Sequence, residues 1–159
     1  MANKAFSILL ADDDEDDCFL FIEALEEIQV ATKLTTVQNG EQLLYLLESM
    51  EEELPHVLFL DLNMPRKNGW QCLEEIKRSE KLKKLKVIIF STSFQQDVAD
   101  QLFKNGALHY IRKPGDFSQL KELILQVLMI LQNEQLHPSG DYSSGRTKAN
   151  YVLLPTIAS

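Results

Sequence analysis

The sequence predicts an α/β fold, in which helices cover both faces of a parallel β-sheet. The first observation is a set of short apolar runs, such as residues 57–60, that end abruptly in acids or turn residues. Runs of this kind are typical of strands buried inside a parallel sheet. The second observation is that longer segments with apolar residues at helical spacing separate these runs. Strands and helices that alternate in this way, joined by right-handed crossovers, form a doubly wound sheet.

Three strands and three helices are expected in the first half of the chain. Residues 5–11, 34–37 and 57–60 are apolar runs and predict the strands. A first helix, over about 15–29, follows from one apolar stripe: Cys18, Phe21, Ile22, Leu25 and Ile28. A second helix opens at Gly40 and has its own stripe: Leu43, Leu46, Leu47 and Met50. The third helix follows the loop between Pro65 and Gly69 and runs through Cys72, Leu73 and Ile76.

The second half adds two strands, two helices and a tail. Residues 86–90 and 108–111 predict strands, and the helix between them, about 95–104, ends at Asn105-Gly106, a helix stop signal. The last helix, about 117–133, has a stripe of six apolar residues: Leu120, Leu123, Ile124, Val127, Leu128 and Leu131. We therefore expect one domain over residues 1–134. The tail over 135–159 is poor in apolar residues until Tyr151, and we expect it to be flexible or docked on the domain.

Composition excludes several classes of function. A chain of 159 residues suits one domain, and its formal net charge of −8 argues against nucleic-acid binding through a basic surface. No apolar stretch is long enough to span a membrane, and the N-terminus lacks the pattern of a secretory signal. Cys18 and Cys72 have no spacing typical of a disulfide framework, so we expect free thiols and a cytoplasmic protein.

Acidic residues gather where the first and third strands end. Six consecutive acids run from Asp12 to Asp17, and Asp61 directly follows the third strand. Open α/β sheets bind ligands beyond the carboxyl ends of their strands, so Asp12, Asp13 and Asp61 meet in one crevice if the two strands are neighbours. Crowded carboxylates repel one another, and a hard divalent cation such as Mg²⁺ relieves this repulsion. Helix capping is the alternative for part of the run, with Asp14 as the N-cap and Asp17 as its capping-box partner.

Four motifs at the strand ends stand in a fixed order. They are Leu10-Ala11-Asp12-Asp13, then Leu60-Asp61-Leu62-Asn63-Met64-Pro65 with Gly69, then Ser91, and finally Lys113-Pro114. Over about residues 5–133 this arrangement resembles the receiver domain of two-component response regulators, such as the chemotaxis regulators. Residues 63–65 and 86–93 are most similar to stand-alone receivers that serve phytochrome-type kinases. The resemblance implies a flavodoxin-like sheet with strand order 2-1-3-4-5, and we expect no separate output domain, so that signalling uses protein contacts to a target that the sequence does not name.

The resemblance also implies a role for each residue at the strand ends. Asp61 would accept a phosphoryl group from a sensor histidine kinase, and the chain would otherwise not be an enzyme. Mg²⁺ would be held by Asp12, Asp13, Asp61 and the backbone carbonyl of Asn63. Ser91 and Lys113 would contact the phosphoryl group, and Tyr110 would be the aromatic switch residue. The family pattern further implies a cis peptide bond before Pro114.

The residues at the strand ends also allow simpler structural interpretations and two other functions. Taken alone, Ser91 is the end of a strand, Lys113 a surface lysine and Tyr110 a strand aromatic. An enzyme of the haloacid dehalogenase type also uses an Asp nucleophile with Mg²⁺, but it needs that Asp after the first strand and a second Asp where this chain has Asn63. The other alternative is a degenerate receiver that binds partners without phosphorylation.

The last helix predicts a contact surface. Leu125, Met129 and Ile130 lie outside its inward stripe, so we expect them to be partly exposed on a face formed by the fourth helix, fifth strand and fifth helix. We expect this face to carry a homodimer contact. Two alternatives are that the tail from Tyr151 folds back over it and that a different protein binds it.

Overall fold

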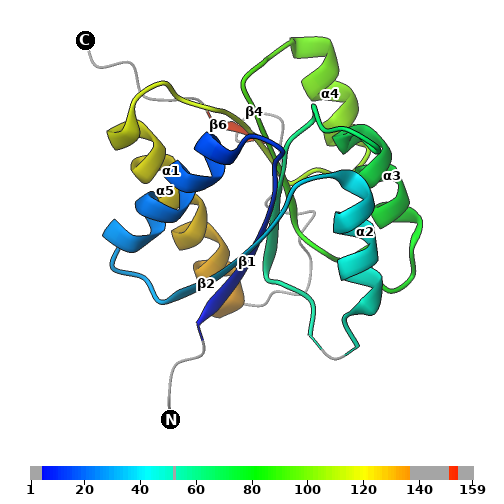
Figure 1. The fold of residues 1–159 in the computed structure, drawn as a ribbon, viewed down its shortest axis with the longest axis horizontal. Coiled ribbons are helices and arrows are strands. Elements are labelled where there is room, and N and C mark those ends of the chain that lie inside the picture. The colour runs from blue at the N-terminus through cyan, green and yellow to red at the C-terminus, as the bar shows by residue number, and fades with distance from the viewer. Residues whose placement is uncertain (1–4, 52, 137–150, 154–159) are drawn as a thin grey trace.

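The structure is a computed structural model that describes residues 5–51, 53–136 and 151–153. One sheet forms its centre, and the strands run from the lower end of Figure 1, near the N-terminus, toward the upper end. The six strands are β1 (Phe6–Ala11), β2 (Thr32–Val37), β3 (Val57–Leu60), β4 (Val87–Ser91), β5 (His109–Arg112) and β6 (Val152–Leu153). The five helices are α1 (Glu15–Glu27), α2 (Gly40–Ser49), α3 (Gly69–Arg78), α4 (Gln96–Lys104) and α5 (Phe117–Leu136).

All strand pairs are parallel, and the strand order is β2-β1-β3-β4-β5-β6. The predicted doubly wound fold with order 2-1-3-4-5 is therefore confirmed, and each predicted strand and helix is present. The short strand β6 extends this sheet at its β5 edge. It comes from the tail, for which docking on the domain was one of the two expected states.

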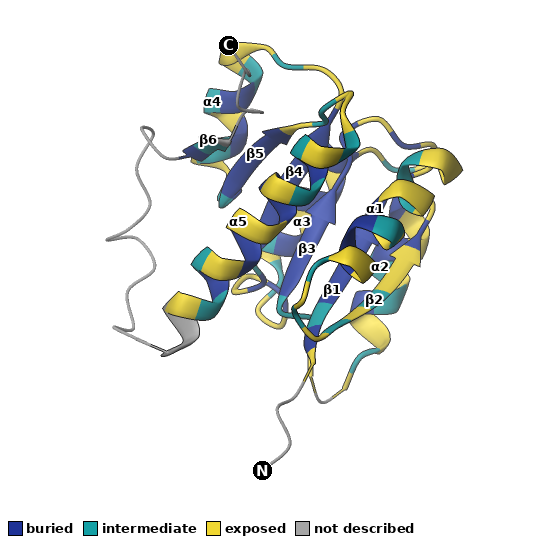
Figure 2. Cartoon of the chain, turned by 90° about the vertical axis from the view of Figure 1, so that its left-hand side faces the viewer, coloured by how far each residue is buried: buried dark blue, intermediate teal, exposed yellow. Residues whose placement is uncertain are grey.

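Helices cover the sheet on both faces, as the alternating pattern requires. Figure 2 shows α1 and α5 lying across one face, with buried sides toward the strands and exposed sides outward. Their core includes Phe21, whose ring packs edge-on against Phe59 and Phe90. A second core lies on the opposite face, where α2, α3 and α4 bury Leu47, Leu73 and Leu102. Strands β3 and β4 are buried along their whole length, as expected of central strands in a parallel sheet that is covered on both faces.

Strand β6 closes the free edge of β5. Val152 pairs with Tyr110 and Leu153 with Ile111. The preceding Tyr151 is buried, its ring packs edge-on against Phe103 of α4, and its carbonyl oxygen accepts a hydrogen bond from Nδ1 of His109. The outer edge of β5 is therefore paired within the same chain. The predicted tail otherwise lies outside the described residues, at 137–150 and 154–159.

The outer side of α5 is partly apolar, as predicted. All six residues of its inward stripe are buried, whereas Leu125 and Met129 are exposed and Ile130 is intermediate. However, Leu125 lines a groove of about 550 Å³ together with Ile28 and Val30, beyond the end of α1. Leu125 therefore faces α1, and its predicted place on the face of α4, β5 and α5 is wrong. The helical spacing of apolar residues correctly predicts which side of α5 is exposed, but it does not predict which element lies next to that side.

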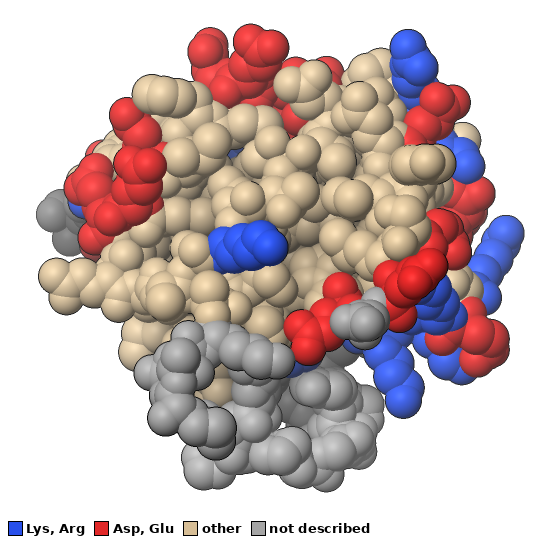
Figure 3. Space-filling view, turned by 60° about the horizontal axis from the view of Figure 1, so that its bottom comes forward, with Lys and Arg blue, Asp and Glu red and all other residues tan. Residues whose placement is uncertain are grey.

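Charged side chains are spread unevenly over the face at the lower end of the molecule. In Figure 3, which brings the lower end of Figure 1 forward, acidic and basic side chains mix along the margin and much of the face carries neither. The described part of the chain contains no helix that is both long enough and apolar enough to cross a bilayer.

Candidate functional site

The carboxyl ends of β1 and β3 place two acids side by side. Ala11 pairs with Leu60 in the parallel register, so Asp12 and Asp61 each follow the last residue of neighbouring strands. The backbone N–H of Asp61 donates to the carbonyl oxygen of Ala11 at 3.0 Å, and that of Asp12 donates to Val37 of β2 at 3.0 Å. Both carboxylates are consequently fixed at the upper rim of the sheet, where ligands bind in open α/β folds.

Three carboxylates converge at this rim. Asp12, Asp13 and Asp61 offer oxygen atoms that all lie within 4.8 Å of one another. Asp12 and Asp61 are buried, whereas Asp13 is exposed. A group of hard oxygen donors, partly open to solvent, matches what a small divalent cation prefers. The expected crevice of Asp12, Asp13 and Asp61 therefore exists, and its donors fit Mg²⁺.

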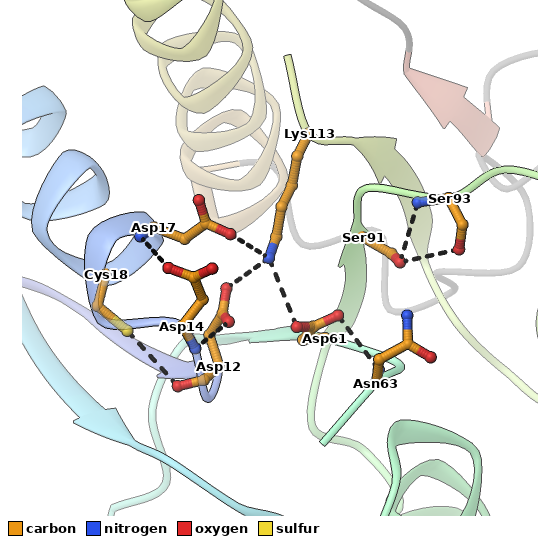
Figure 4. A network of polar contacts seen from close by, with 9 residues as sticks. All are labelled: Asp12, Asp14, Asp17, Cys18, Asp61, Asn63, Ser91, Ser93 and Lys113. Atoms are coloured by element: carbon orange, nitrogen blue, oxygen red, sulfur yellow. Dashed lines mark hydrogen bonds and ion pairs between the residues drawn. The ribbon is translucent and has the colours of Figure 1, made fainter. Parts of the chain in front are cut away.

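The remaining acids of the run are placed by the start of α1. Asp14 is the N-cap: its side chain accepts from the backbone N–H of Asp17 at 3.0 Å. The predicted return contact from Asp17 is absent, because the N–H of Asp14 donates instead to Oδ1 of Asp12 at 3.0 Å. The capping alternative thus holds for Asp14 and is wrong for Asp17, whose carboxylate points into the site (Figure 4).

Lys113 is the cation of the site. Its Nζ lies 2.7 Å from Asp12 Oδ2, 2.8 Å from Asp17 Oδ2 and 3.5 Å from Asp61 Oδ2. Its side chain is only 7% exposed, and Figure 4 shows it reaching from the end of β5 into the cluster of acids. A surface lysine is therefore excluded. The predicted cis bond before Pro114 is wrong, since no cis peptide bond occurs among the described residues.

Burial and charge set the ionisation of the central pair. The pKa of Asp61 is raised to about 6: burial is the main cause, the Asp12 carboxylate acts in the same direction, and the Lys113 ammonium opposes both. Burial alone would lower the pKa of Lys113, but its hydrogen bonds to Asp12 and Asp17 outweigh burial and raise that pKa. The ammonium is thus held charged, whereas ionisation of Asp61 is costly without a further cation.

The loop after β3 is shaped to keep Asp61 accessible. The N–H of Asn63 donates to Asp61 Oδ1 at 3.3 Å, and the side chain of Asn63 is exposed beside the acids. The N–H of Gly69 donates to Leu62 at 3.0 Å, and a Cβ at Gly69 would collide with the backbone of Asp61 and Leu62. Asn68 then caps α3 through a full capping box with Gln71. Only glycine at position 69 allows α3 to start this close to the site.

Ser91 and Tyr110 lie on the other side of Asp61. Ser91 is buried at the end of β4, and its hydroxyl lies 3.3 Å from Ser93 Oγ and 3.4 Å from the N–H of Ser93. The Tyr110 hydroxyl donates to the carbonyl oxygen of Ser93, and its ring packs edge-on against Phe94. Tyr110 is fully buried, and burial raises its pKa. Ser91, the loop of Ser93 and Tyr110 are therefore connected through one short hydrogen-bonded segment.

A family model for the response regulator receiver domain matches residues 8–125. The chain belongs to this family. Among its relatives is "Probable methanogenesis regulatory protein FilR2" of Methanothrix harundinacea, which is 30% identical over 129 residues, covering 79% of this chain and 83% of that protein. "Response regulator Rcp1" of Synechocystis is 27% identical, over 77% of this chain and 86% of that protein.

Solved receiver structures agree with the fold and with the predicted subgroup. The phosphorylated cyanobacterial phytochrome response regulator RcpA is 29% identical, with a TM-score of 0.68 over 87% of this chain and 97% of that chain. The Mn²⁺-bound form of Rcp1 is 26% identical, with a TM-score of 0.69 over 76% of this chain and 90% of that chain. The predicted resemblance to phytochrome-associated receivers is confirmed. The chain is therefore a response regulator receiver of two-component signalling.

Of the residues predicted for the site, the structure gathers Asp12, Asp13, Asp61 and Lys113 in one cluster, and the N–H of Asn63 contacts Asp61. Ser91 and Tyr110 both contact Ser93 in the loop after β4. Sequence reasoning missed two others. Asp17 was assigned to helix capping, although its i+3 spacing from Asp14 puts it on the inner side of the first helical turn. Ser93 gave no signal, because its contact to Tyr110 uses the backbone carbonyl, which any residue has.

Proposed function

We propose that the chain receives a phosphoryl group on Asp61 from the phosphohistidine of a sensor histidine kinase and passes the signal on through protein contacts. The observation that carries this proposal is the position of Asp61, a buried carboxylate next to Asp12 and Asp13 and within 3.5 Å of the Lys113 ammonium. Phosphoryl transfer needs mainly positioning and neutralisation of charge, and these neighbours supply both.

The carboxylates Asp12, Asp13 and Asp61, with the backbone carbonyl of Asn63, are proposed to hold Mg²⁺. When bound, the cation would neutralise charge on the phosphoryl oxygens and relieve the repulsion among the acids. The fit of the donor set supports this assignment, as does Rcp1, a relative solved with Mn²⁺ bound. RcpA, a further relative, was solved in a phosphorylated form.

The protein's own residues then have separate tasks. A carboxylate oxygen of Asp61 attacks phosphorus in line, the new O–P bond forms as the N–P bond to the donor imidazole breaks, and an acyl phosphate results. Lys113 donates to a phosphoryl oxygen and stabilises the added negative charge. The Ser91 hydroxyl turns from Ser93 to a second phosphoryl oxygen, which distinguishes the two states. Tyr110 of β5, whose hydroxyl donates to the carbonyl oxygen of Ser93, would move with this loop and carry the change to the surface beside α4.

The proposal includes the setting of the reaction. The chain modifies itself from a donor and has no other substrate, so we do not regard it as an enzyme. The partner is a histidine kinase, and the location is the cytoplasm, with which the free thiols of Cys18 and Cys72 agree. We also propose a homodimer through α4, β5 and α5. Since β6 pairs with the edge of β5, the second copy would contact α4 and α5 beside β6 or displace β6.

Intact-mass measurement tests the proposal. Incubation with acetyl phosphate and Mg²⁺ is expected to add one phosphoryl group to the wild-type chain and none to Asp61→Asn. Removal of Mg²⁺ with a chelator should prevent the gain. A chain that gains no phosphoryl group with Mg²⁺ would instead be a degenerate receiver, and turnover of free phosphomonoesters would indicate a phosphatase.

A further inference from the structure

The carboxylate of Asp17 makes a contact for which the reaction at Asp61 has no obvious need. Asp17 Oδ2 lies 2.8 Å from Nζ of Lys113, as close as the 2.7 Å contact from Asp12. The same ammonium is 3.5 Å from Asp61, the residue whose phosphoryl group it is expected to contact. Of the three carboxylates, Asp61, the proposed phosphoacceptor, therefore makes the weakest hydrogen bond with Lys113.

Helix capping does not explain where the Asp17 side chain points. Asp17 is the third residue of α1, the position from which a capping-box side chain returns to the N-cap backbone. That N–H, of Asp14, already donates to Asp12 at 3.0 Å. The Asp17 backbone is fixed by the Asp14 side chain at 3.0 Å, so its carboxylate is free to turn inward. Both capping contacts thus direct Asp17 toward Lys113 (Figure 4).

All three N–H donors of the Lys113 ammonium are engaged in this arrangement. An ammonium has three N–H donors, and three carboxylates surround this one. A phosphoryl oxygen on Asp61 would be a fourth acceptor, so one carboxylate must give up its contact. Asp12 is fully buried, and its Oδ2 atom would lose the ammonium without compensation from water, whereas the Asp17 side chain is 29% exposed and can be hydrated. Asp17 is the contact that can be released at the smallest cost.

We propose that Asp17 is a positioning residue that holds Lys113 beside Asp12 and away from Asp61 in the unphosphorylated protein. Its release lets Lys113 reach the phosphoryl group, so Asp17 slows phosphorylation and keeps the resting state distinct. The resting contact stands on the geometry alone, while the effect on phosphorylation rests on the proposed function of Asp61.

Three variants test this proposal. Asp17→Asn removes the carboxylate, and Asp17→Glu keeps it. Asp16→Asn is the matched control, because Asp16 lies in the same helical turn, is exposed and loses the same charge. The first readout is the ¹H–¹⁵N signal of the Lys113 side-chain ammonium in metal-free protein, assigned through Lys113→Arg. We expect this signal to move in Asp17→Asn and to stay in place in the other two variants.

The second readout is the rate of phosphorylation by acetyl phosphate at saturating Mg²⁺. We expect Asp17→Asn to react roughly threefold to tenfold faster than wild type, the size expected when one charge-assisted hydrogen bond no longer competes. Asp16→Asn and Asp17→Glu should react like wild type. Thermal melting of all variants checks that each is folded.

Each result decides one part of the proposal. An unchanged Lys113 signal in Asp17→Asn overturns the resting contact, whatever the rates are. A moved signal with a rate equal to that of Asp16→Asn, or below wild type, overturns the effect on phosphorylation. If the wild-type chain gains no phosphoryl group, the proposed function fails, and the ammonium signal still decides whether Asp17 holds Lys113.

Discussion

Replacement of Asp61 by Asn should stabilise the metal-free protein. Burial raises the pKa of Asp61 from 3.8 to about 6, so the folded state resists ionisation of this carboxyl more than the unfolded state does. Each difference of one in pKa corresponds to 1.36 kcal/mol, which sets an upper bound of about 3 kcal/mol on the cost of ionised Asp61 at pH 7. The attraction of the Lys113 ammonium already lowers this pKa, so it is included in the bound, and we expect a gain of up to about 3 kcal/mol for Asp61→Asn.

The pH dependence of this effect has a definite sign. Below about pH 3, Asp61 is protonated in both states, because its pKa is 3.8 in the unfolded chain and higher in the folded one, so Asp61→Asn and wild type should have similar free energies of unfolding. Between about pH 4 and pH 6 the folded wild type holds this proton more tightly than the unfolded chain, and its stability falls as pH rises relative to the variant. Above about pH 6 the difference should be constant.

Urea unfolding in chelator-treated buffer, followed by circular dichroism at several pH values, measures this difference. Addition of Mg²⁺ provides an internal control, because binding to the folded wild type stabilises it by about 2.7 kcal/mol at a concentration of 100 times Kd. Mg²⁺ should therefore reduce or reverse the advantage of Asp61→Asn. A variant that is less stable than wild type in metal-free buffer at pH 7, or a difference independent of pH, would refute the view that Asp61 is an electrostatically strained carboxylate.

Three further predictions concern the metal, the kinase and the tail. Asp13→Asn should weaken Mg²⁺ binding at least tenfold, as measured by Trp70 fluorescence, because charged oxygen ligands dominate such sites. Equal losses of affinity in Asp13→Asn and Asp16→Asn would mean that the acids act only as a diffuse charge. Phe19, 59% exposed on α1 near the site, should contact the kinase, so Phe19→Asp should slow transfer from a phosphorylated kinase but not from acetyl phosphate; Tyr45→Asp on α2 is the control, and equal effects with both donors would contradict this role. Deletion of residues 151–159 should speed amide hydrogen exchange in β5 and promote self-association in sedimentation, since β6 pairs with this edge; unchanged exchange would show that β6 does not protect β5.

The five main strands and the cluster of acids at their carboxyl ends could be predicted from the sequence for a physical reason. Strands of a parallel sheet are apolar throughout, so runs such as residues 57–60 are visible in the sequence, and all their carboxyl ends meet at one rim. Asp12 and Asp61 each follow such a run directly. Their proximity therefore follows from topology, without knowledge of any side-chain conformation.

Side-chain direction could not be predicted in the same way. The direction of the Asp17 side chain depends on whether the N–H of Asp14 donates to Asp12 or to Asp17. A sequence motif does not predict which of these two carboxylates accepts the hydrogen bond. The neighbour of Leu125 depends on the angle between α5 and α1, which the period of one helix does not contain. Pairing of β6 depends on contacts among Tyr151, Phe103 and His109, which are distant in sequence.

The central claim is that Asp61 is the phosphoacceptor, and trapping of the acyl phosphate tests it most directly. After reaction with acetyl phosphate and Mg²⁺, borohydride reduces an aspartyl phosphate to homoserine, and peptide mass spectrometry locates the converted residue. We predict conversion at position 61 alone, dependent on Mg²⁺ and absent without the phosphodonor. Conversion at Asp12, Asp13 or another acid with Asp61 intact, or no conversion in a chain that binds Mg²⁺, would contradict this assignment.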